Sequence, residues 1–191
     1  MVSQLQHSQP NIICLTGPMG SGKGEVGIYC RIKYGYSVYP FYPSLDIELT
    51  RNQIIPTRRN FQKKLSTMQC NEGPYKIATL AKQQIKNRCS QKVILDGARC
   101  LKEVMCLHQI EFGKVVTVYV DAPIDVRRDR IIRRRRSIDP QDTEELRKVM
   151  LVDLHCVKDC KDVNGVVILN NIGDINFLHS QIDRLMAGTI D

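Results

Sequence analysis

The sequence predicts an α/β domain with a five-stranded parallel sheet that is covered by helices on both faces. Three observations predict it. Short apolar runs alternate with longer segments of helical spacing along the whole chain, which is typical of parallel sheets. A Gly-rich turn directly follows the first apolar run. The 191 residues contain neither an internal repeat nor a low-complexity linker, and this length suits one domain.

The first elements surround the Gly-rich turn. A buried strand is expected at Asn11–Thr16, because NIICLT is a short apolar run. A helix is expected next, over 24–35, with Gly35 as its end. Ser37–Tyr42 has the composition of a strand, although Pro40 limits it to a strand end or a sheet edge.

The middle of the chain is expected to be helical. Ser44 is placed to cap a helix that begins LDIELTR and that Pro56 breaks. Further helices are expected over 59–68 and over 75–88, the latter with Pro74 near its first turn.

The second half returns to alternating strands and helices. Buried strands are expected at 93–95, 115–120 and 166–169. Helices are expected over 100–109, over the arginine-rich segment from 124, from a cap at Asp139-Pro140 toward Leu154, and from a cap at Asp174 to Gly188.

The composition excludes several classes of protein. Hydrophobic residues make up 42% and charged residues 25% of the chain, which argues against disorder. No apolar run approaches the roughly 18 residues of a membrane span, and the polar start MVSQLQHSQP lacks the features of a secretory signal. The eight cysteines have no C-x-x-C spacing, which argues against a zinc ribbon. We therefore expect a cytoplasmic protein with reduced thiols and no membrane partner.

The formal net charge of +8 is concentrated in one segment. Residues 127–136 read RRDRIIRRRR, a run of seven arginines and one aspartate. A nucleic-acid-binding protein usually spreads basic residues over a face, whereas one short basic segment suits a local polyphosphate ligand. A nucleic-acid-binding or localisation segment and a solvated helix face are the alternatives.

Residues 17–23 read GPMGSGK and match the phosphate-binding pattern G-x-x-x-x-G-K. Glycines let backbone N–H groups converge on phosphate oxygens, and the following helix N-terminus adds partial positive charge. A strand precedes this turn and a helix follows it, as the pattern requires. We expect the nucleotide to bind at Gly17, Met19, Gly20, Ser21, Gly22, Lys23, Gly24 and Glu25, with Lys23 on the β- and γ-phosphates.

The residue after Lys23 departs from the usual pattern. It is Gly24, so the hydroxyl group that commonly binds Mg²⁺ is missing. Either the metal is held through water, phosphate and Asp96, with Glu25 contributing through water, or the loop binds nucleotide without efficient catalysis.

The loop GPMGSGKGE resembles G-x-P-G-x-G-K-G-T of the nucleoside monophosphate kinases, in which Gly also follows Lys, although Glu25 stands where they have Thr. It is more similar to G-x-P-x-S-G-K-G-E of an archaeal group of kinase-like proteins, relatives of adenylate and dephospho-coenzyme A kinases. The resemblance covers about residues 11–186 in motif order. It implies a P-loop three-layer sandwich with strand order 2-3-1-4-5 and the use of ATP and Mg²⁺.

Two further segments carry the same resemblance. VILDGARC resembles the strand-end D-G-x-R of these kinases, which implies that Asp96 binds Mg²⁺ or its waters and that Arg99 contacts the phosphate of the acceptor. VVILNNIGDINFL resembles the closing segment that lies beside the ATP base in dephospho-coenzyme A kinase relatives. It implies backbone contacts from Asn171 and Gly173.

The arginine segment resembles the lid of the monophosphate kinases. Arg127, Arg130 and Arg134 are spaced so that they share one helix face. The R-x-x-x-R pattern of such lids implies that Arg130 contacts the adenine and Arg134 the phosphates, and that Arg136 reaches the transferred group. The other arginines of the segment are expected to be solvated or to support the helix.

The acceptor site is the part that the resemblance does not fix. In FYPSLDIELTR the family's acidic signal is absent, and Asp46 falls where the relatives carry Arg. Arg51, Arg58 or Arg59 is a candidate to replace that arginine. The expected organisation is one domain, with a flexible arm at 1–10, an acceptor-binding insertion at about 44–72 and a lid at about 124–150.

These observations predict ATP-dependent phosphoryl transfer to a small acceptor, a (deoxy)nucleoside monophosphate. Asp46 and Arg51, with Arg99 and Arg136, are the expected substrate-binding residues. Dephospho-coenzyme A is the alternative acceptor, and its hydroxyl group requires a carboxylate base. A nucleotide-binding regulatory or RNA-associated protein without turnover is the non-enzymatic alternative. The sequence gives no oligomeric state.

Overall fold

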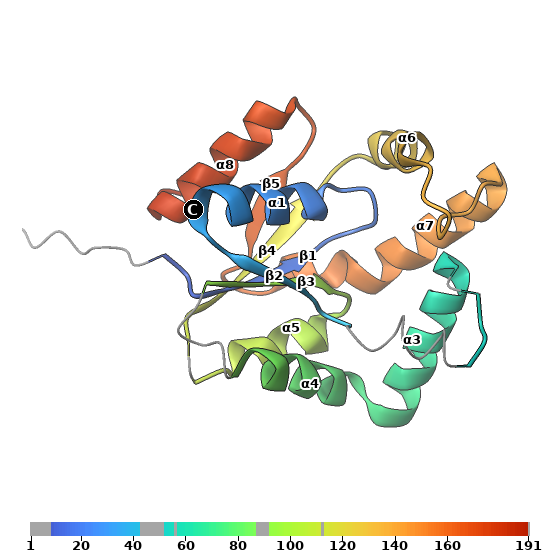
Figure 1. Ribbon diagram of the computed structural model, residues 1–191, viewed down its shortest axis with the longest axis horizontal. Helices are drawn as coiled ribbons and strands as arrows, with labels where there is room; N and C mark the ends of the chain where they lie inside the picture. Colours follow the sequence, from blue (N-terminus) through green and yellow to red (C-terminus); the bar gives the residue numbers. More distant parts are fainter. Residues whose placement is uncertain (1–8, 43–51, 56, 87–91, 112, 191) are drawn as a thin grey trace, which may run out of the picture.

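The computed structural model describes residues 9–42, 52–55, 57–86, 92–111 and 113–190. Its centre is a five-stranded parallel sheet in the order β2-β3-β1-β4-β5, as the sequence predicts (Figure 1). The strands are β1 (Ile12–Thr16), β2 (Ser37–Pro40), β3 (Val93–Ala98), β4 (Val115–Asp121) and β5 (Val167–Asn170).

Two hydrophobic clusters hold the layers together, one on each face of the sheet. Ile13 and Leu15 belong to the cluster under α1 (Lys23–Tyr34) and α8 (Ile175–Ala187). Their neighbours in β1 belong to the opposite cluster, because successive side chains of a strand point to opposite faces. The opposite face is covered by α4 (Pro74–Lys86) and α5 (Leu101–His108) (Figure 1).

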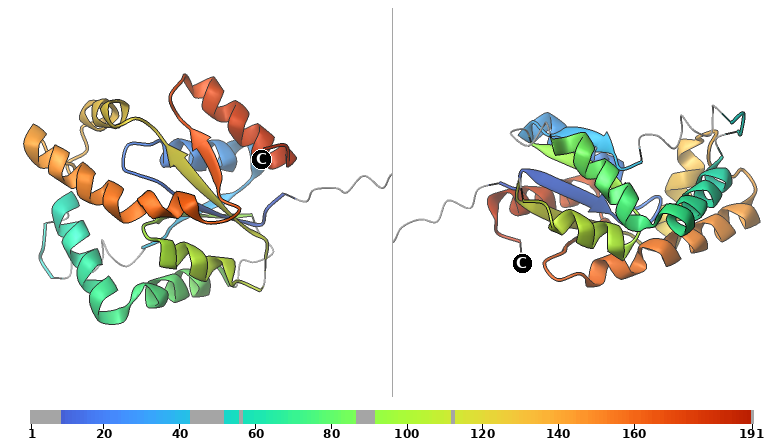
Figure 2. Two further views of the ribbon diagram at one scale, coloured as in Figure 1. Left: turned by 180° about the vertical axis from the view of Figure 1, so that it is seen from behind. Right: turned by 90° about the horizontal axis from the view of Figure 1, so that it is seen from below.

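A third, smaller cluster lies where β1 and β3 end. It contains Met19 of the Gly-rich loop, Ile131 of α6 (Ile124–Arg134), and three residues of α7 (Thr143–Val157). The helices α3 (Arg58–Glu72), α6 and α7 gather at this end of the sheet (Figure 2). In an open α/β sheet, ligands bind beyond the carboxyl ends of the strands, so these helices surround the expected site.

Most predicted helix ends are confirmed. Gly35 and Gly188 are left-handed at the ends of α1 and α8, and Asp174 caps α8 by accepting a hydrogen bond from the N–H of Phe177. The predicted cap at Asp139 is wrong. The carboxylate of Asp139 is buried against arginines, and Asp142 caps α7 instead.

Pro10, the last residue of the predicted arm, packs against the core. It is buried, and its carbonyl accepts a 2.5 Å hydrogen bond from the hydroxyl of Tyr36. The cysteines for which the structure gives a state are free thiols. Cys160 lies in a short 3-10 helix, η1 (Lys158–Asp162), rather than in the helix of Cys156. No helix of the described ranges has the length and apolarity to cross a membrane.

Candidate functional site

The Gly-rich loop packs so tightly that three of its positions admit no side chain. Gly17, Gly20 and Gly22 have φ of 124°, 79° and 108°, which is the region that favours glycine. A Cβ atom at Gly22 would lie 2.1 Å from Nδ2 of Asn171, and one at Gly17 would lie 2.3 Å from the carbonyl oxygen of Val120. The glycines of the motif therefore fit the loop against β4 and the β5–α8 turn.

Lys23 folds back over the loop. Its ammonium donates hydrogen bonds to the carbonyls of Gly17, at 2.6 Å, and Pro18, at 3.0 Å. Burial lowers the pKa of Lys23 to about 8, although the carboxylates of Asp153 and Asp96 favour its charged form. A phosphate bound in the loop would replace the two carbonyls as the partner of this ammonium.

Asp96 lies in β3, two residues before the strand ends at Ala98, and pairs with Leu15 of β1. Its Oδ1 atom is buried without a hydrogen-bond partner, and burial raises its pKa, while the charges of Lys23, Arg99 and Arg136 act in the opposite direction. A buried carboxylate oxygen without a partner is suited to Mg²⁺ or one of its waters. Among the described residues, no group of three or more His, Cys, Asp or Glu side chains is arranged to hold a metal by itself.

Glu25 has a different partner. Its carboxylate lies 3.0 Å from Nε2 of His179 in α8, and the His179 ring stacks on Tyr29 with the ring centroids 3.8 Å apart. This pairing favours a role between α1 and α8 over the water-mediated metal contact that the sequence suggests.

The structure adds Asp153, a residue that the sequence analysis does not single out. It is buried in α7, and its carboxylate accepts a 2.6 Å hydrogen bond from the N–H of Met19 and a second bond from Nη1 of Arg99. Burial opposes the charge of Asp153, but the positive charges of Arg99 and Lys23 outweigh this effect and lower its pKa. The buried face of α7 carries the signal that was missed: Asp153 follows Leu146 and Met150 at helical spacing.

The arginines on the inner face of α6 brace the loop. Arg127 is buried and donates hydrogen bonds to the carbonyls of Ala122 and, at 3.4 Å, Met19. Arg130 donates to the carbonyl and, at 3.0 Å, to the side-chain oxygen of Asn171. Asn171 in turn donates a 2.7 Å hydrogen bond to the carbonyl of Ser21. The arginine segment therefore contacts the phosphate loop directly in the folded chain.

The segments predicted as the lid and the insertion meet at Asp139. Arg134 of α6 donates two hydrogen bonds to the Asp139 carboxylate, of 2.8 and 3.1 Å, and Arg58 of α3 donates one of 3.3 Å. The backbone N–H of Arg58 also donates to the carbonyl of Ile138. One buried carboxylate thus joins an arginine from each of the two segments.

The predicted residues separate into two groups. The charges of Lys23, Arg99 and Arg136 all act on Asp96, so these three residues lie near that carboxyl group. Arg130 and Asn171 contact the loop at the carbonyl of Ser21, and Gly173 is exposed in the β5–α8 turn. Asp46 and Arg51 lie outside the described residues.

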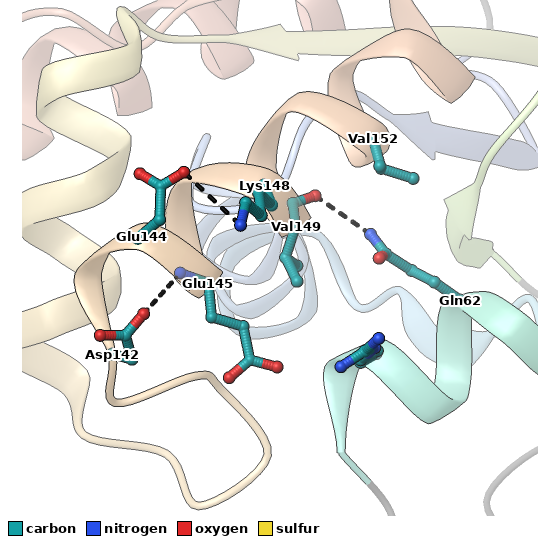
Figure 3. Close-up of a pocket in the computed structure, with 8 residues that line it drawn as sticks. Gln62, Asp142, Glu144, Glu145, Lys148, Val149 and Val152 are labelled. Carbon is teal, nitrogen blue, oxygen red and sulfur yellow. Dashed lines mark hydrogen bonds and ion pairs between the residues drawn. The ribbon is translucent and has the colours of Figure 1, made fainter.

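A separate cavity of about 420 Å³ lies between α3 and α7. Figure 3 shows Gln62 of α3 reaching the main chain of α7, where its amide donates a 3.2 Å hydrogen bond to the carbonyl of Val149. The lining residues are Arg59, Gln62, Asp142, Glu144, Glu145, Lys148, Val149 and Val152. None of the expected nucleotide-binding residues lines it.

In sequence, the chain is similar to UPF0200 proteins of archaea. It is 32% identical to one from Hyperthermus butylicus over 143 residues, which are 75% of each chain. It is 31% identical to one from Methanosarcina mazei, over 71% of this chain and 72% of that protein. It is 28% identical to one from Pyrobaculum aerophilum, over 92% of this chain and 97% of that protein. These relatives agree with the archaeal resemblance of the loop, whereas kinship with monophosphate or dephospho-coenzyme A kinases stays a prediction.

In structure, the chain resembles small-molecule kinases. A gluconokinase from Sinorhizobium meliloti matches with a TM-score of 0.62 and 15% identity, over 95% of this chain and 97% of that one. A shikimate kinase from Acinetobacter baumannii matches with a TM-score of 0.56 and 16% identity, over 94% and 92%. These likenesses show the fold, which is that of the P-loop kinases. No protein-family model matches the chain.

Proposed function

The chain belongs to the UPF0200 family, and we propose that it is an ATP-dependent kinase whose acceptor is a small anion, a (deoxy)nucleoside monophosphate. One observation carries the proposal. Arg99, directly after the adjacent strand β3, donates a hydrogen bond to the buried carboxylate of Asp153, and Lys23 of the phosphate loop lies close enough for its charge to lower the pKa of the same carboxyl group. A group suited to the donor phosphates and a group suited to an acceptor phosphate therefore lie near one buried carboxylate.

The charges of the site support an anionic acceptor. Arg99 lies close enough to Arg58 and to Asp96 to affect the pKa of each, and Arg136 acts on Asp96 as well. Guanidinium groups bind phosphate through paired hydrogen bonds, so three arginines around one centre favour a phosphorylated acceptor over a neutral sugar.

The proposed reaction is an in-line displacement. An oxygen of the acceptor phosphate forms a bond to the γ-phosphorus of ATP while the bond to the β–γ bridging oxygen breaks, and ADP leaves with that oxygen. Lys23 exchanges its carbonyl partners for the β- and γ-phosphates, and Arg134 and Arg136 stabilise the charge that spreads over the transferred group. A monophosphate oxygen is already ionised near neutral pH, so this reaction needs no strong base.

Mg²⁺ fits the donors that are present. Asp96, whose buried oxygen has no partner, would hold the ion or one of its waters, and the ion would supply neutralisation of phosphate charge. Arg130 and Asn171, which border the loop at Ser21, are proposed to lie beside the nucleotide base together with Gly173.

A hydroxyl acceptor, as in dephospho-coenzyme A, is the second candidate. The observation that favours it is the same unpaired Asp96 oxygen, since burial also raises the pKa of this carboxyl group and makes it a better base. In that case Asp96 would take the proton of the attacking hydroxyl.

The experiment that tests the proposal is ADP production from ATP and Mg²⁺ with a panel of all NMPs, dNMPs and dephospho-coenzyme A. We expect acceptor-dependent ADP release with one acceptor class, and its loss in Lys23→Ala. Nucleotide binding without turnover on any acceptor would contradict the kinase and favour a regulatory or RNA-associated protein. In that case binding to RNA should weaken steeply with added salt.

A further inference from the structure

We propose that Asp153 is a positioning residue for both substrates, because its single carboxylate fixes the phosphate loop at Met19 and holds Arg99 on the acceptor side. The inference rests on the proposed function for its acceptor half only. Its nucleotide half concerns binding at the loop and can be tested without turnover.

Asp153 contacts the phosphate loop at Met19. Oδ2 of Asp153 accepts a 2.6 Å hydrogen bond from the N–H of Met19, the third residue of the phosphate-binding pattern. The Met19 side chain is buried in the cluster with α6 and α7, and its carbonyl accepts a hydrogen bond from Arg127. Asp153 thus completes a set of contacts that fixes Met19 through its N–H, its carbonyl and its side chain.

Asp153 also contacts the side chain of Arg99. Its guanidinium donates to Oδ1 of Asp153 and lies 5.7 Å from the centre of the Phe61 ring in α3. Its backbone N–H donates a 2.8 Å hydrogen bond to the carboxylate of Glu103, which also accepts from the hydroxyl of Tyr42. Because the main chain of Arg99 is held separately, Asp153 governs the direction of the guanidinium rather than the path of the chain.

Because Asp153 is negatively charged, a positioning role and a purely electrostatic role predict opposite effects of its removal on nucleotide binding. Asp153 attracts Lys23, and both lie at the site for anionic phosphates. A carboxylate that contributed only its charge would repel the phosphates, so its removal would tighten nucleotide binding. A carboxylate that shapes the loop predicts the opposite result, weaker binding after its removal.

Two substitutions of Asp153 distinguish its contact with Met19 from its contact with Arg99. Asp153→Ala removes both hydrogen bonds, whereas Asp153→Asn keeps an oxygen for the N–H of Met19 and loses the charge that pairs with Arg99. The control is Glu144→Gln, which alters an exposed carboxylate on the same helix. Nucleotide affinity is measured by calorimetry with a non-hydrolysable ATP analogue and Mg²⁺, and the fold is checked by the thermal unfolding transition.

We expect Asp153→Ala to weaken binding of the analogue at least tenfold, and Asp153→Asn to change it less than threefold. With the acceptor found in the panel, Asp153→Asn should raise the acceptor KM at least tenfold with a smaller change in kcat. In an Arg99→Ala background, Asp153→Asn should raise that KM no further. Glu144→Gln should match the unchanged protein in each measurement.

Unchanged or tighter binding of the analogue by folded Asp153→Ala would overturn the loop half of the proposal. An additive effect of Asp153→Asn in the Arg99→Ala background would overturn the Arg99 half. If Asp153→Ala fails to fold, Asp153→Asn tests the loop half of the proposal. A tenfold loss of analogue binding in Asp153→Asn would show that the negative charge of Asp153, and not its hydrogen bond with Met19, determines the conformation of the loop. That result would overturn the loop half of the proposal. If the unchanged protein turns over no acceptor, the proposed function fails, and analogue binding still decides the loop half.

Discussion

The phosphate-loop side and the insertion side of the site are held together in different ways. On the loop side, Met19 and Ser21 are contacted by buried partners from α6, α7 and the β5–α8 turn. On the insertion side, α3 contacts the segment predicted as the lid through the carboxylate of Asp139 and the carbonyl of Ile138, and it contacts α7 through the amide of Gln62. The cavity of about 420 Å³ lies beside that second contact.

The difference indicates how binding proceeds. A loop that is held by hydrogen bonds at Met19 and Ser21 and by close packing at its glycines is preorganised, and it loses little entropy when phosphate arrives. Arginines that share one carboxylate can exchange it for a phosphate at small cost, since both are anions that accept paired hydrogen bonds. We therefore expect the donor half to bind with little rearrangement and the acceptor half to close around its ligand.

Gly22→Ala gives the largest expected effect, because it disrupts the fitted side. The new Cβ would lie 2.1 Å from Nδ2 of Asn171, at a φ of 108°, and such strain costs about 1–3 kcal/mol before any clash. Nucleotide binding should fall roughly 100-fold, since about 2.7 kcal/mol of the loop's fit is lost. Calorimetry measures the loss of nucleotide affinity, and thermal unfolding measures the loss of stability.

Gly24→Ala is the matched control for stability. A Cβ at Gly24 meets nothing within 4 Å, so the substitution should raise the free energy of unfolding by about 0.5–1 kcal/mol. Equal stability of the two variants would contradict the tight fit of the loop at Gly22.

Asp139→Ala tests the insertion side. It removes the partner of Arg58 and Arg134, whose side chains are 15% and 26% exposed, so water compensates part of the loss and the expected cost is about 1–3 kcal/mol. Acceptor KM should rise while affinity for an ATP analogue changes little. An equal loss of acceptor binding and of affinity for the ATP analogue would show that the loop side and the insertion side of the site do not act independently.

The pH dependence of nucleotide binding sharpens the account of Lys23. Its pKa is lowered to about 8 in the ligand-free chain, and bound phosphates raise it again. Below pH 8 the ammonium is already present, whereas above pH 8 binding must take up a proton. Affinity should therefore fall about tenfold per pH unit above that value. Lys23→Met should bind weakly and without this slope, and a slope that persists in Lys23→Met would assign it to another group.

Glu25→Gln gives the smallest expected effect. Glu25 lies in the first turn of α1 and pairs with His179, so removal of its charge should strengthen nucleotide binding by about two- to threefold, a few tenths of a kcal/mol. A weaker Mg²⁺-dependent affinity would instead support the water-mediated metal contact that the sequence suggests.

The sheet and the phosphate loop could be predicted because their signals are local. GPMGSGK is contiguous, and each strand is a short apolar run. Asp153 could not be predicted in the same way, since its contact with Met19 spans 134 positions of the chain. The prediction of Asp139 as a cap is wrong because Asp-Pro is only a local helix-start signal, whereas the burial of Asp139 against Arg58 and Arg134 depends on how α3 and α6 meet.

The most direct test of the account is to follow phosphorus in the reaction. ATP, Mg²⁺ and the mixed monophosphates are incubated with the protein, and the products are observed by ³¹P NMR. The account predicts that the γ-phosphate signal of ATP decreases as the β-phosphate signal of a new nucleoside diphosphate appears, and that Arg99→Ala slows both. Unchanged ATP, or release of inorganic phosphate without a new diphosphate, would contradict it.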